Sequence, residues 1–216
     1  MQDRYIPTAV IRRLPRYYRY LRDLKDSGVE RISSGRLSEI MGVTASQIRQ
    51  DLNHFGGFGQ QGYGYNTGYL YNEIGELLGL NEHHGMILIG AGNLGEAVIG
   101  YINSRGLNHR FIAAFDIDSR LFGTRIADVP VLPMSELKSF VEENGVDIVA
   151  LTVPAAAAVE TAGLLVDSSI RAVWNFAHVD LPLPDSIIVE DVHLLDSLMR
   201  LTYSLHAGDD KDHGKH

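Results

Sequence analysis

The sequence of 216 residues contains no cysteine. Disulfide bonds, thiolate catalysis, cysteine-ligated zinc and thiol-based redox sensing are therefore excluded. Long hydrophobic runs are also missing, because the longest, DIVALTVPAAAAV over residues 147–159, is too short to span a bilayer comfortably. The N-terminus lacks the apolar core of a secretory signal. We therefore expect a cytoplasmic protein with no membrane partner.

Positive charge is scarce overall but concentrated near the N-terminus. The net charge is −8, yet residues 1–78 carry ten Lys and Arg against eight Asp and Glu, whereas the remainder carries nine against nineteen. Residues 4–22 hold six arginines and no acid. Since phosphates respond to the local field, this segment can bind DNA through Arg12, Arg13 and Arg16. A solvated, arginine-rich helix face is the alternative.

Residues 33–55 predict two short helices joined by a glycine-containing turn. Ser33 or Ser34 can cap the first helix, which runs through Met41, and Thr44 with Gln47 can form a capping box for the second. This spacing is typical of a helix-turn-helix motif.

The second of these helices, over residues 45–55, has one apolar and one polar face. The apolar face is formed by Ala45, Ile48, Leu52 and Phe55. The opposite face lacks the Glu and Lys usual on a solvated helix, and its side chains suit base edges and phosphates. Its members are Ser46, Gln47, Arg49, Gln50, Asn53 and His54. DNA recognition is favoured over an ordinary amphipathic helix.

Glycines alternate with aromatic residues in GGFGQQGYGYNTGYL, residues 56–70. We interpret this segment as a packed hairpin anchored by Phe58, Tyr63 and Tyr65, and not as a flexible linker. Such a wing beside a recognition helix can enter the minor groove. Thr67 can cap a following helix that ends near Leu80. Residues 1–80 are thus predicted to form a winged-helix domain, followed by a linker over 81–85.

The stretch MILIGAGNLGEA, residues 86–97, combines a buried strand, the glycine pattern G-x-G-x-x-G and the start of a helix. Gly90, Gly92 and Gly95 have the spacing that lets a backbone turn approach a pyrophosphate. The next strand ends at Asp116, where an acid can bond both ribose hydroxyls and repel a 2′-phosphate. NAD(H) is therefore favoured over NADP(H), although Arg120 and Arg125 nearby weaken that preference.

Strands and helices continue to alternate to residue 190, which predicts a doubly wound, mostly parallel Rossmann sheet over 86–190. Ile117, Val153, Pro154, Asn175 and Phe176 follow strand ends, where such sheets bind ligands. Plain loop positions are the alternative for the last four.

Candidate catalytic and metal-binding residues are few in the sequence. His178 is the one acid–base candidate at a strand end, and no carboxylate or arginine partner stands at a readable spacing. Nucleophile-elbow, H-E-x-x-H and Walker patterns are absent from the sequence. We expect no enzymatic activity and no metal site.

The last predicted helix, within residues 191–206, is apolar around much of its circumference. Its leucines and methionine cannot all face one sheet, so a partner subunit is expected to bury them, with exchange of the helix between subunits as one route. Residues 207–216 are polar and are expected to be a disordered tail.

Several segments together resemble the Rex family of redox-sensing transcriptional repressors, in the same order over about residues 5–205. They are IRQDLNHFGGFGQQGYGYN, ILIGAGNLGEA, AFDID, LTVP, NFA and VEDVHLLDSLMRL. The resemblance implies a homodimer with N-terminal winged helices, Rossmann domains and swapped C-terminal helices. It further implies binding of NADH and NAD+, and binding of palindromic operator DNA that ends when NADH closes the dimer.

The resemblance also assigns roles by position. The adenosine and pyrophosphate would be held by Gly90, Ala91, Gly92, Asn93, Leu94, Gly95 and Asp116. Tyr101 would lie near the nicotinamide and the subunit interface, with Asn175 and Phe176 flanking the ring. DNA would be contacted by Arg49 and by the wing residues Gln61, Gly62, Tyr63 and Tyr65.

Five positions depart from the family's common pattern. Gln50 and Gln61 stand where many members have Lys or Arg, His178 stands where proline is usual, and His193 and Leu194 replace Asp and Phe. Two alternatives remain open, an NAD-dependent oxidoreductase and a coenzyme A-binding module with an accessory N-terminal domain.

Overall fold

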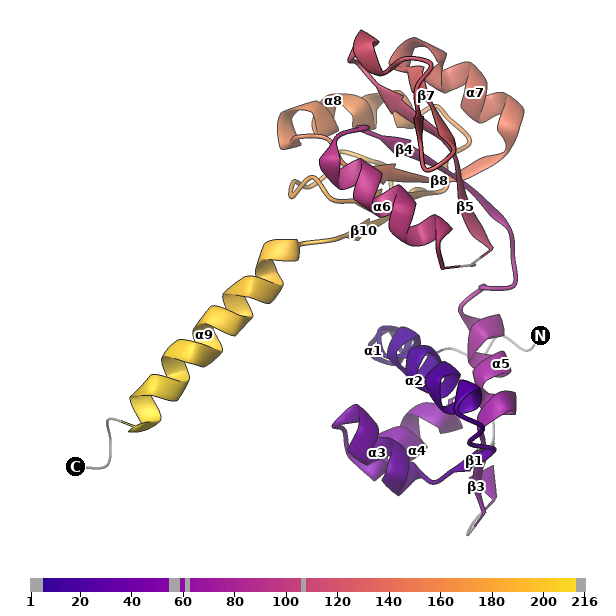
Figure 1. Cartoon of the computed structure of the whole chain (residues 1–216), viewed down its shortest axis with the longest axis vertical. Helices are drawn as coiled ribbons and strands as arrows, with labels where there is room; N and C mark the ends of the chain where they lie inside the picture. The colour runs from indigo at the N-terminus through magenta and orange to yellow at the C-terminus, as the bar shows by residue number, and fades with distance from the viewer. Residues whose placement is uncertain (1–5, 55–58, 61–62, 106–107, 213–216) are drawn as a thin grey trace. The chain divides into compact units, whose positions relative to one another are not determined.

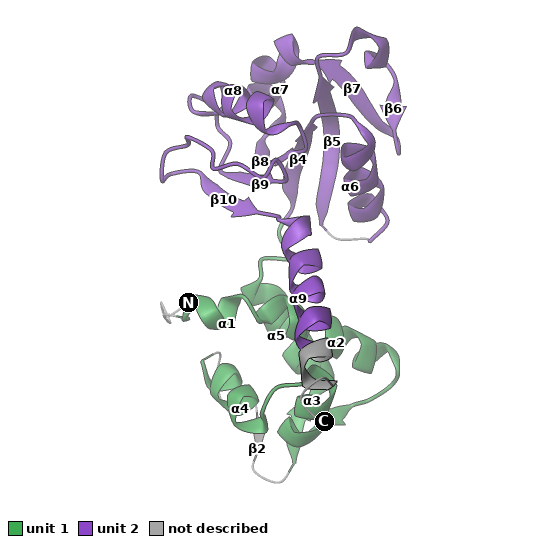
Figure 2. Ribbon diagram, turned by 90° about the vertical axis from the view of Figure 1, so that its left-hand side faces the viewer, with its two compact units in different colours: residues 1–82 green, residues 83–216 purple. Residues whose placement is uncertain are grey.

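The computed structural model describes residues 6–54, 59–60, 63–105 and 108–212. The chain divides into two compact units, Met1–Glu82 (unit 1) and His83–His216 (unit 2) (Figure 1, Figure 2). The first strand of unit 2 begins at His84, inside the stretch expected to be a linker.

Unit 1 is a small helical domain with a three-stranded antiparallel sheet. Its helices are α1 (Thr8–Ile11), α2 (Leu14–Asp26), α3 (Ser34–Met41), α4 (Ala45–Asn53) and α5 (Thr67–Leu77). Its strands are β1 (Arg31–Ile32), β2 (Gly59–Gln60) and β3 (Gly64–Asn66), in the order β1-β3-β2. The helix-turn-helix and the hairpin beside it are thus present where the sequence predicts them.

The helix boundaries of unit 1 follow local capping chemistry. The Ser33 hydroxyl accepts a hydrogen bond from the amide of Arg36, and Gly42 ends α3 with a φ of 62°. The Thr44 hydroxyl caps α4 by accepting from the amide of Gln47. The expected cap of α5 is wrong by one residue, because Asn66 and not Thr67 accepts the amide of Tyr69. Phe55 and Phe58 lie outside the described residues.

The core of unit 1 joins its helices to the sheet. It comprises Leu14, Tyr17, Leu21, Ile32, Leu37, Met41, Ile48, Leu52, Tyr65, Leu70 and Ile74. Tyr65 is 8% exposed, so its side chain anchors the hairpin and is not presented for the DNA contact expected of it. Tyr63, two residues earlier, is 70% exposed and does not anchor the hairpin as expected.

Unit 2 is built on a seven-stranded sheet in the order β10-β9-β8-β4-β5-β7-β6. The strands are β4 (His84–Ile89), β5 (His109–Asp116), β6 (Arg125–Ile126), β7 (Val129–Pro133), β8 (Val146–Leu151), β9 (Ala172–Asn175) and β10 (Ile188–Asp191). All neighbouring strands are parallel except the β6–β7 pair. The doubly wound architecture is confirmed.

Helices cover both faces of this sheet (Figure 1). The helical segments between the strands are α6 (Asn93–Asn103), η1 (Ser119–Leu121), η2 (Met134–Glu136), α7 (Leu137–Asn144) and α8 (Ala155–Leu165). Helix α9 (Leu194–Asp212) follows β10 and extends away from the sheet (Figure 1). Because alternate residues of a strand point to opposite faces, Met86 and Leu88 pack with Ile99 of α6. Ile87 and Ile89 pack on the other face with residues of α7 and α8.

The hairpin β6–β7 was not predicted from the sequence. Its turn residues, Ala127 and Asp128, have φ values of 44° and 68°. Positive φ at both central residues suits a two-residue hairpin, but such turns normally carry Asn or Gly. The residues of this turn therefore do not predict a hairpin from the sequence.

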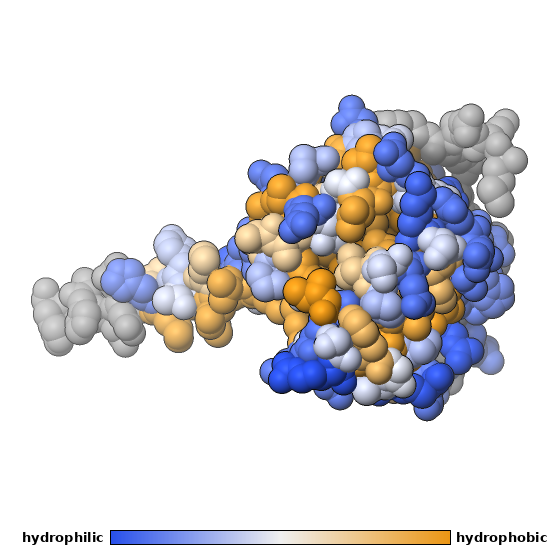
Figure 3. Space-filling view, turned by 90° about the horizontal axis from the view of Figure 1, so that it is seen from above, coloured by the Kyte–Doolittle hydropathy of each residue, from blue (hydrophilic) through white to orange (hydrophobic). Residues whose placement is uncertain are grey.

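Helix α9 exposes most of its apolar side chains. It runs to Asp212, six residues beyond the end expected at residue 206. Apolar side chains are visible along it in Figure 3, and the exposed fractions of Leu194, Leu195, Leu198, Met199, Leu201 and Leu205 are all between 54% and 66%. No helix within the described ranges is both long and apolar enough to cross a membrane.

Candidate cofactor and DNA-binding sites

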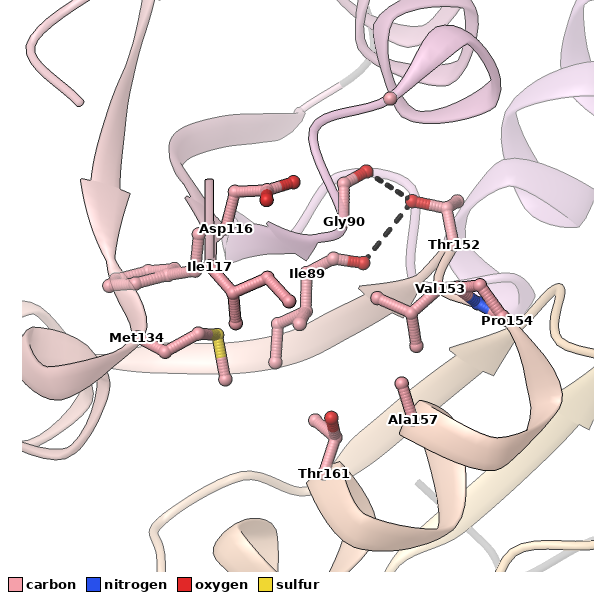
Figure 4. Close-up of a pocket in the computed structure, with 12 residues that line it drawn as sticks. Ile89, Gly90, Asp116, Ile117, Met134, Thr152, Val153, Pro154, Ala157 and Thr161 are labelled. Carbon is pink, nitrogen blue, oxygen red and sulfur yellow. Dashed lines mark hydrogen bonds between the residues drawn. The ribbon is translucent and has the colours of Figure 1, made fainter. Parts of the chain in front are cut away.

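A cavity of about 290 Å³ opens at the carboxyl ends of β4, β5 and β8 (Figure 4). It is lined by Ile89, Gly90, Gly92, Phe115, Asp116, Ile117, Met134, Thr152, Val153, Pro154, Ala157 and Thr161. The lining therefore brings together six of the predicted cofactor residues, Gly90, Gly92, Asp116, Ile117, Val153 and Pro154. Parallel sheets bind ligands at this edge.

The glycine-rich turn between β4 and α6 is packed tightly on one side and open on the other. Gly90 has a φ of 101°, and a Cβ added there would lie 2.7 Å from Cγ1 of Val153. A Cβ at Gly95 would collide with the carbonyl oxygen of Gly90. The Thr152 hydroxyl donates to that same oxygen at 2.7 Å. A Cβ added at Gly92, in contrast, would meet no atom within 4 Å, so the open side of the turn lies there.

The N-terminus of α6 offers a phosphate-binding position. Gly92 precedes the helix in an extended conformation, and no side chain caps the first amides. Asn93 and Leu94 are exposed, whereas the amide of Ala91 donates to Oδ2 of Asp116 at 2.7 Å. Free amides and the helix dipole at this end favour an anion. The open Gly92 and these amides fit a dinucleotide pyrophosphate.

Asp116 stands at the end of β5, where a ribose diol is expected. Its Oδ1 accepts the amide of Asp118, which together with the Ala91 bond fixes the carboxylate beside the turn. Arg120 is occupied by Asp118, with an Nη2–Oδ2 distance of 2.6 Å, and this bond lowers the pKa of Asp118 to about 2. Arg125 donates to the carbonyl oxygen of Asp128. Both arginines thus have a hydrogen-bond partner within the protein.

Seven of the predicted cofactor residues do not line this cavity. Four belong to the glycine-rich turn and the start of α6, and the other three are Tyr101, Asn175 and Phe176. The four are Ala91, Asn93, Leu94 and Gly95. Tyr101 is 59% exposed on α6, where Arg105 lies 4.5 Å from its ring. Asn175 is buried, and its amide nitrogen donates to Val179 O and to Asp191 Oδ1. Phe176 is also buried and meets Trp174 edge to face. In this structure Asn175 supports the loop after β9.

Two of the departures from the family pattern contact each other. The Nδ1 atoms of His178 and His193 are 3.1 Å apart, and the rings are stacked. His178 has a φ of 52°, a value that a proline at this position could not adopt, since the ring of proline fixes φ near −65°. The loop after β9 is thus tied to the residue that precedes α9.

Sequence reasoning missed several residues of the cavity. Thr152 follows β8 directly and was overlooked beside Val153 and Pro154, although its position at a strand end was a usable signal. Ala157 and Thr161 are one helical turn apart on α8. Met134 lines the cavity from the segment directly after β7. Strand β7 itself was not predicted from the sequence.

Arg49 is the one Lys or Arg residue of the predicted recognition helix α4. It is exposed, and its guanidinium donates to the hydroxyls of Ser34 on α3 and Ser46 on α4, both at 3.1 Å. These bonds hold the side chain across the two helices of the motif. A guanidinium fixed in this way retains further donors for a base or phosphate.

Two of the predicted DNA-binding residues are directed into the protein. Both Nε and Nη2 of Arg13 donate to the carboxylate of Asp51 at 2.7 Å. The side-chain amide of Gln47 donates to the same carboxylate at 2.8 Å, so the expected return bond of the capping box is replaced. The geometry thus gives Arg13 and Gln47 an internal partner.

The other predicted DNA-binding positions in the described ranges are exposed. They are Arg12, Arg16, Ser46, Gln50, Asn53 and Tyr63. Gln61 and Gly62 lie outside the described residues. Among the residues that the structure describes, no group of three or more His, Asp or Glu side chains could hold a metal ion.

Two family models match separate parts of the chain. The model described as "Putative DNA-binding protein N-terminus" matches residues 5–53, and the model described as "CoA binding domain" matches residues 81–179. The first supports the DNA-binding interpretation of unit 1. The second covers the Rossmann region, for which a coenzyme A-binding module was one of the alternatives.

Relatives and solved structures match nearly the whole chain. The redox-sensing transcriptional repressor Rex of Thermoanaerobacter sp. (strain X514) is 52% identical over 93% of this chain and 89% of its own length. The Rex of Clostridioides difficile (strain 630) is 48% identical over 95% and 98%. RSP in complex with β-NAD+ and operator DNA is 49% identical over 98% of both chains, with a TM-score of 0.89. RSP in complex with β-NADH is 46% identical over 97% and 98%, also with a TM-score of 0.89.

This level of identity extends across the helix-turn-helix, the Rossmann sheet and the last helix together. It confirms the resemblance noted in the sequence and decides against a coenzyme A module. The chain belongs to the Rex family of redox-sensing transcriptional repressors.

Proposed function

We propose that this chain represses transcription by binding palindromic operator DNA as a homodimer, and that NADH releases it. The observation that carries the proposal is the near 50% identity, over both units, to RSP, which has been solved with β-NAD+ and operator DNA and with β-NADH. The cavity at Gly92 and Asp116 supplies the sensor, and the exposed face of α4 supplies the output. A repressor acts where the DNA is, so the proposal includes a cytoplasmic location.

The sensing step rests on the charge of the nicotinamide. The oxidised ring carries a positive charge and the reduced ring does not. Burying an unpaired cation costs several kcal/mol, so an apolar pocket around the nicotinamide favours the reduced ring. We infer that NADH stabilises a dimer geometry in which the two recognition helices no longer match half-sites about one helical turn apart.

The oxidoreductase alternative receives no support from the site. The imidazole of His178 meets that of His193, and no carboxylate of the described residues is hydrogen-bonded to it. We therefore assign the cofactor a ligand role and the protein no catalytic role.

Asp116 should set the choice of cofactor. In an Asp116→Asn variant we expect NADH affinity to fall about ten-fold or more, because bonds from the ribose hydroxyls to a charged acceptor are lost. The ratio of the NADH affinity to the NADPH affinity should fall as well. Fluorescence titration with both cofactors measures the two effects. The control is Asp118→Asn. In the wild type the carboxylate of Asp118 binds Arg120, so this variant should keep an NADH affinity within about two-fold of the wild-type value.

Arg49 should contribute directly to operator affinity. In an Arg49→Ala variant we expect a loss of about 1–3 kcal/mol in binding free energy, the usual worth of a bidentate base contact. Fluorescence anisotropy with labelled duplex measures it. Arg36→Ala serves as the control, because Arg36 is exposed on α3 and pairs with Glu39. Equal losses in the two variants would contradict a specific contact by Arg49.

The proposed function is tested by operator binding with each cofactor in turn. A palindromic duplex selected by the wild-type dimer from a random pool is titrated with protein alone, with NAD+ and with NADH. We expect tight binding in the first two cases and at least ten-fold weaker binding with NADH. Affinities that do not differ between the cofactors would overturn the proposal.

A further inference from the structure

Helix α4 carries a fully buried carboxylate on the side opposite its exposed polar face. Asp51 is 0% exposed and lies between Ile48 and Leu52, which are buried in the core of unit 1. An ionised group in such a place is costly unless it is fully hydrogen-bonded. Asp51 therefore needs hydrogen-bond donors from the surrounding side chains.

The carboxylate accepts four hydrogen bonds from three residues. Oδ1 accepts from Nη2 of Arg13 and from Nε2 of Gln47, and Oδ2 accepts from Nε of Arg13 and from the hydroxyl of Tyr17. The distances are 2.7, 2.8, 2.7 and 3.0 Å in that order. Both oxygens thus have two donors, and the arginine binds in the bidentate geometry that gives the strongest pairs.

These contacts keep the carboxylate charged. Burial alone would raise the pKa of Asp51, but the hydrogen bonds from Arg13, Gln47 and Tyr17 outweigh burial and hold that pKa below its ordinary value. The same carboxylate raises the pKa of Arg13. The pair is therefore ionised throughout the physiological pH range.

The donors come from different parts of unit 1. Arg13 lies at the junction of α1 and α2, Tyr17 lies on α2, and Gln47 lies one turn before Asp51 on α4 itself. Apolar contacts alone let a helix rotate or slide slightly, whereas a bidentate ion pair accepts only a narrow range of orientations. The contacts of Asp51 thus fix the rotation of α4 about its own axis relative to α2.

We propose that Asp51, with Arg13, Tyr17 and Gln47, forms a positioning unit that sets the orientation of the recognition helix. Arg13 and Gln47 act through Asp51 and not by touching DNA, despite their place in an arginine-rich segment and on a polar helix face. The inference rests on the proposed operator binding. Arg13 therefore does not neutralise a phosphate of the DNA.

The test is a double-mutant cycle on operator affinity. Arg13→Gln and Asp51→Asn are made singly and together, and anisotropy is read well below each variant's melting temperature. If Arg13 acts through Asp51, each single change weakens binding about ten-fold and the double variant is no worse than the weaker single. If Arg13 contacts a phosphate, the losses multiply to about a hundred-fold, which overturns the inference.

Tyr17→Phe keeps the inference testable even if the charged variants do not fold. This change removes one hydroxyl from a side chain that is 0% exposed and cannot reach DNA. We expect about two- to five-fold weaker operator binding, since one hydrogen bond to the carboxylate is lost. Wild-type affinity in the folded variant would show that Tyr17 serves stability alone and would overturn the inference.

Salt dependence and cofactor binding separate this inference from the proposed function. The slope of log affinity against log salt should be unchanged in Tyr17→Phe, because no phosphate contact is removed. NADH affinity, a property of unit 2, should stay at the wild-type value in every variant. Failure of the wild-type protein to bind duplex or to release it with NADH would refute the proposed function, whereas an additive cycle in a functional protein refutes only the positioning unit.

Discussion

A Gly92→Ala variant should fold normally, bind operator and fail to respond to NADH. Gly92 has ordinary backbone angles (φ −79°, ψ −172°), and its added methyl group meets no protein atom within 4 Å. The same space is where a pyrophosphate must approach the turn. We expect NADH affinity to fall about a hundred-fold or more, equivalent to about 2.7 kcal/mol. Cofactor titration measures the NADH affinity, and thermal unfolding measures the stability of the fold.

The control for Gly92→Ala is Gly163→Ala. Gly163 lies in α8, and a Cβ added there also has no neighbour within 4 Å. This variant should be slightly more stable than the wild type, because alanine favours a helix over glycine by about 1 kcal/mol, and its NADH affinity should be unchanged. If Gly92→Ala binds NADH within a few-fold of the control, the pyrophosphate does not pass over Gly92.

A Leu198→Glu, Leu205→Glu double variant should dissociate the dimer. The two leucines are seven residues apart and are 56% and 66% exposed in the single chain. Burying a leucine stabilises an interface by about 1.5–3 kcal/mol, and a glutamate in its place adds an unpaired charge. We expect a monomer at micromolar concentration and operator affinity at least a hundred-fold lower, because the half-sites are then bound independently. Sedimentation and anisotropy measure these outcomes.

The matched control changes the polar side of the same helix. Ser197 and Ser204 have the same seven-residue spacing on α9 and are exposed. Ser197→Glu with Ser204→Glu adds the same charge, and it should leave both the dimer and operator binding intact. If the leucine variant also remains a dimer, then α9 is not the subunit interface.

Much of the fold could be predicted because its determinants are local. Gly90 and Gly95 are required by contacts within a few residues or with the adjacent strand end, so the spacing of the glycines carries the information. The caps of α3 and α4 lie within three residues of the amides that they bind. Alternating apolar strands and amphipathic helices then specify a parallel sheet.

What the sequence did not reveal depends on contacts between distant residues. Arg13 and Asp51 are separated by 38 positions, and nothing in the local pattern marks them as partners. Helical spacing does place Asp51 three residues after Ile48, on the apolar side, and this was the one available signal. The basic character of residues 4–22 instead suggested that Arg13 faces DNA. Contact between His178 and His193 was hidden in the same way.

The redox state of the nicotinamide should be linked to operator binding. This linkage is tested most directly by measuring the dissociation constant of NADH with and without saturating operator duplex. Linkage requires DNA to weaken NADH binding by the same factor by which NADH weakens DNA binding, which we expect to be at least ten-fold. An NADH affinity that is identical in the presence and absence of operator would contradict the account.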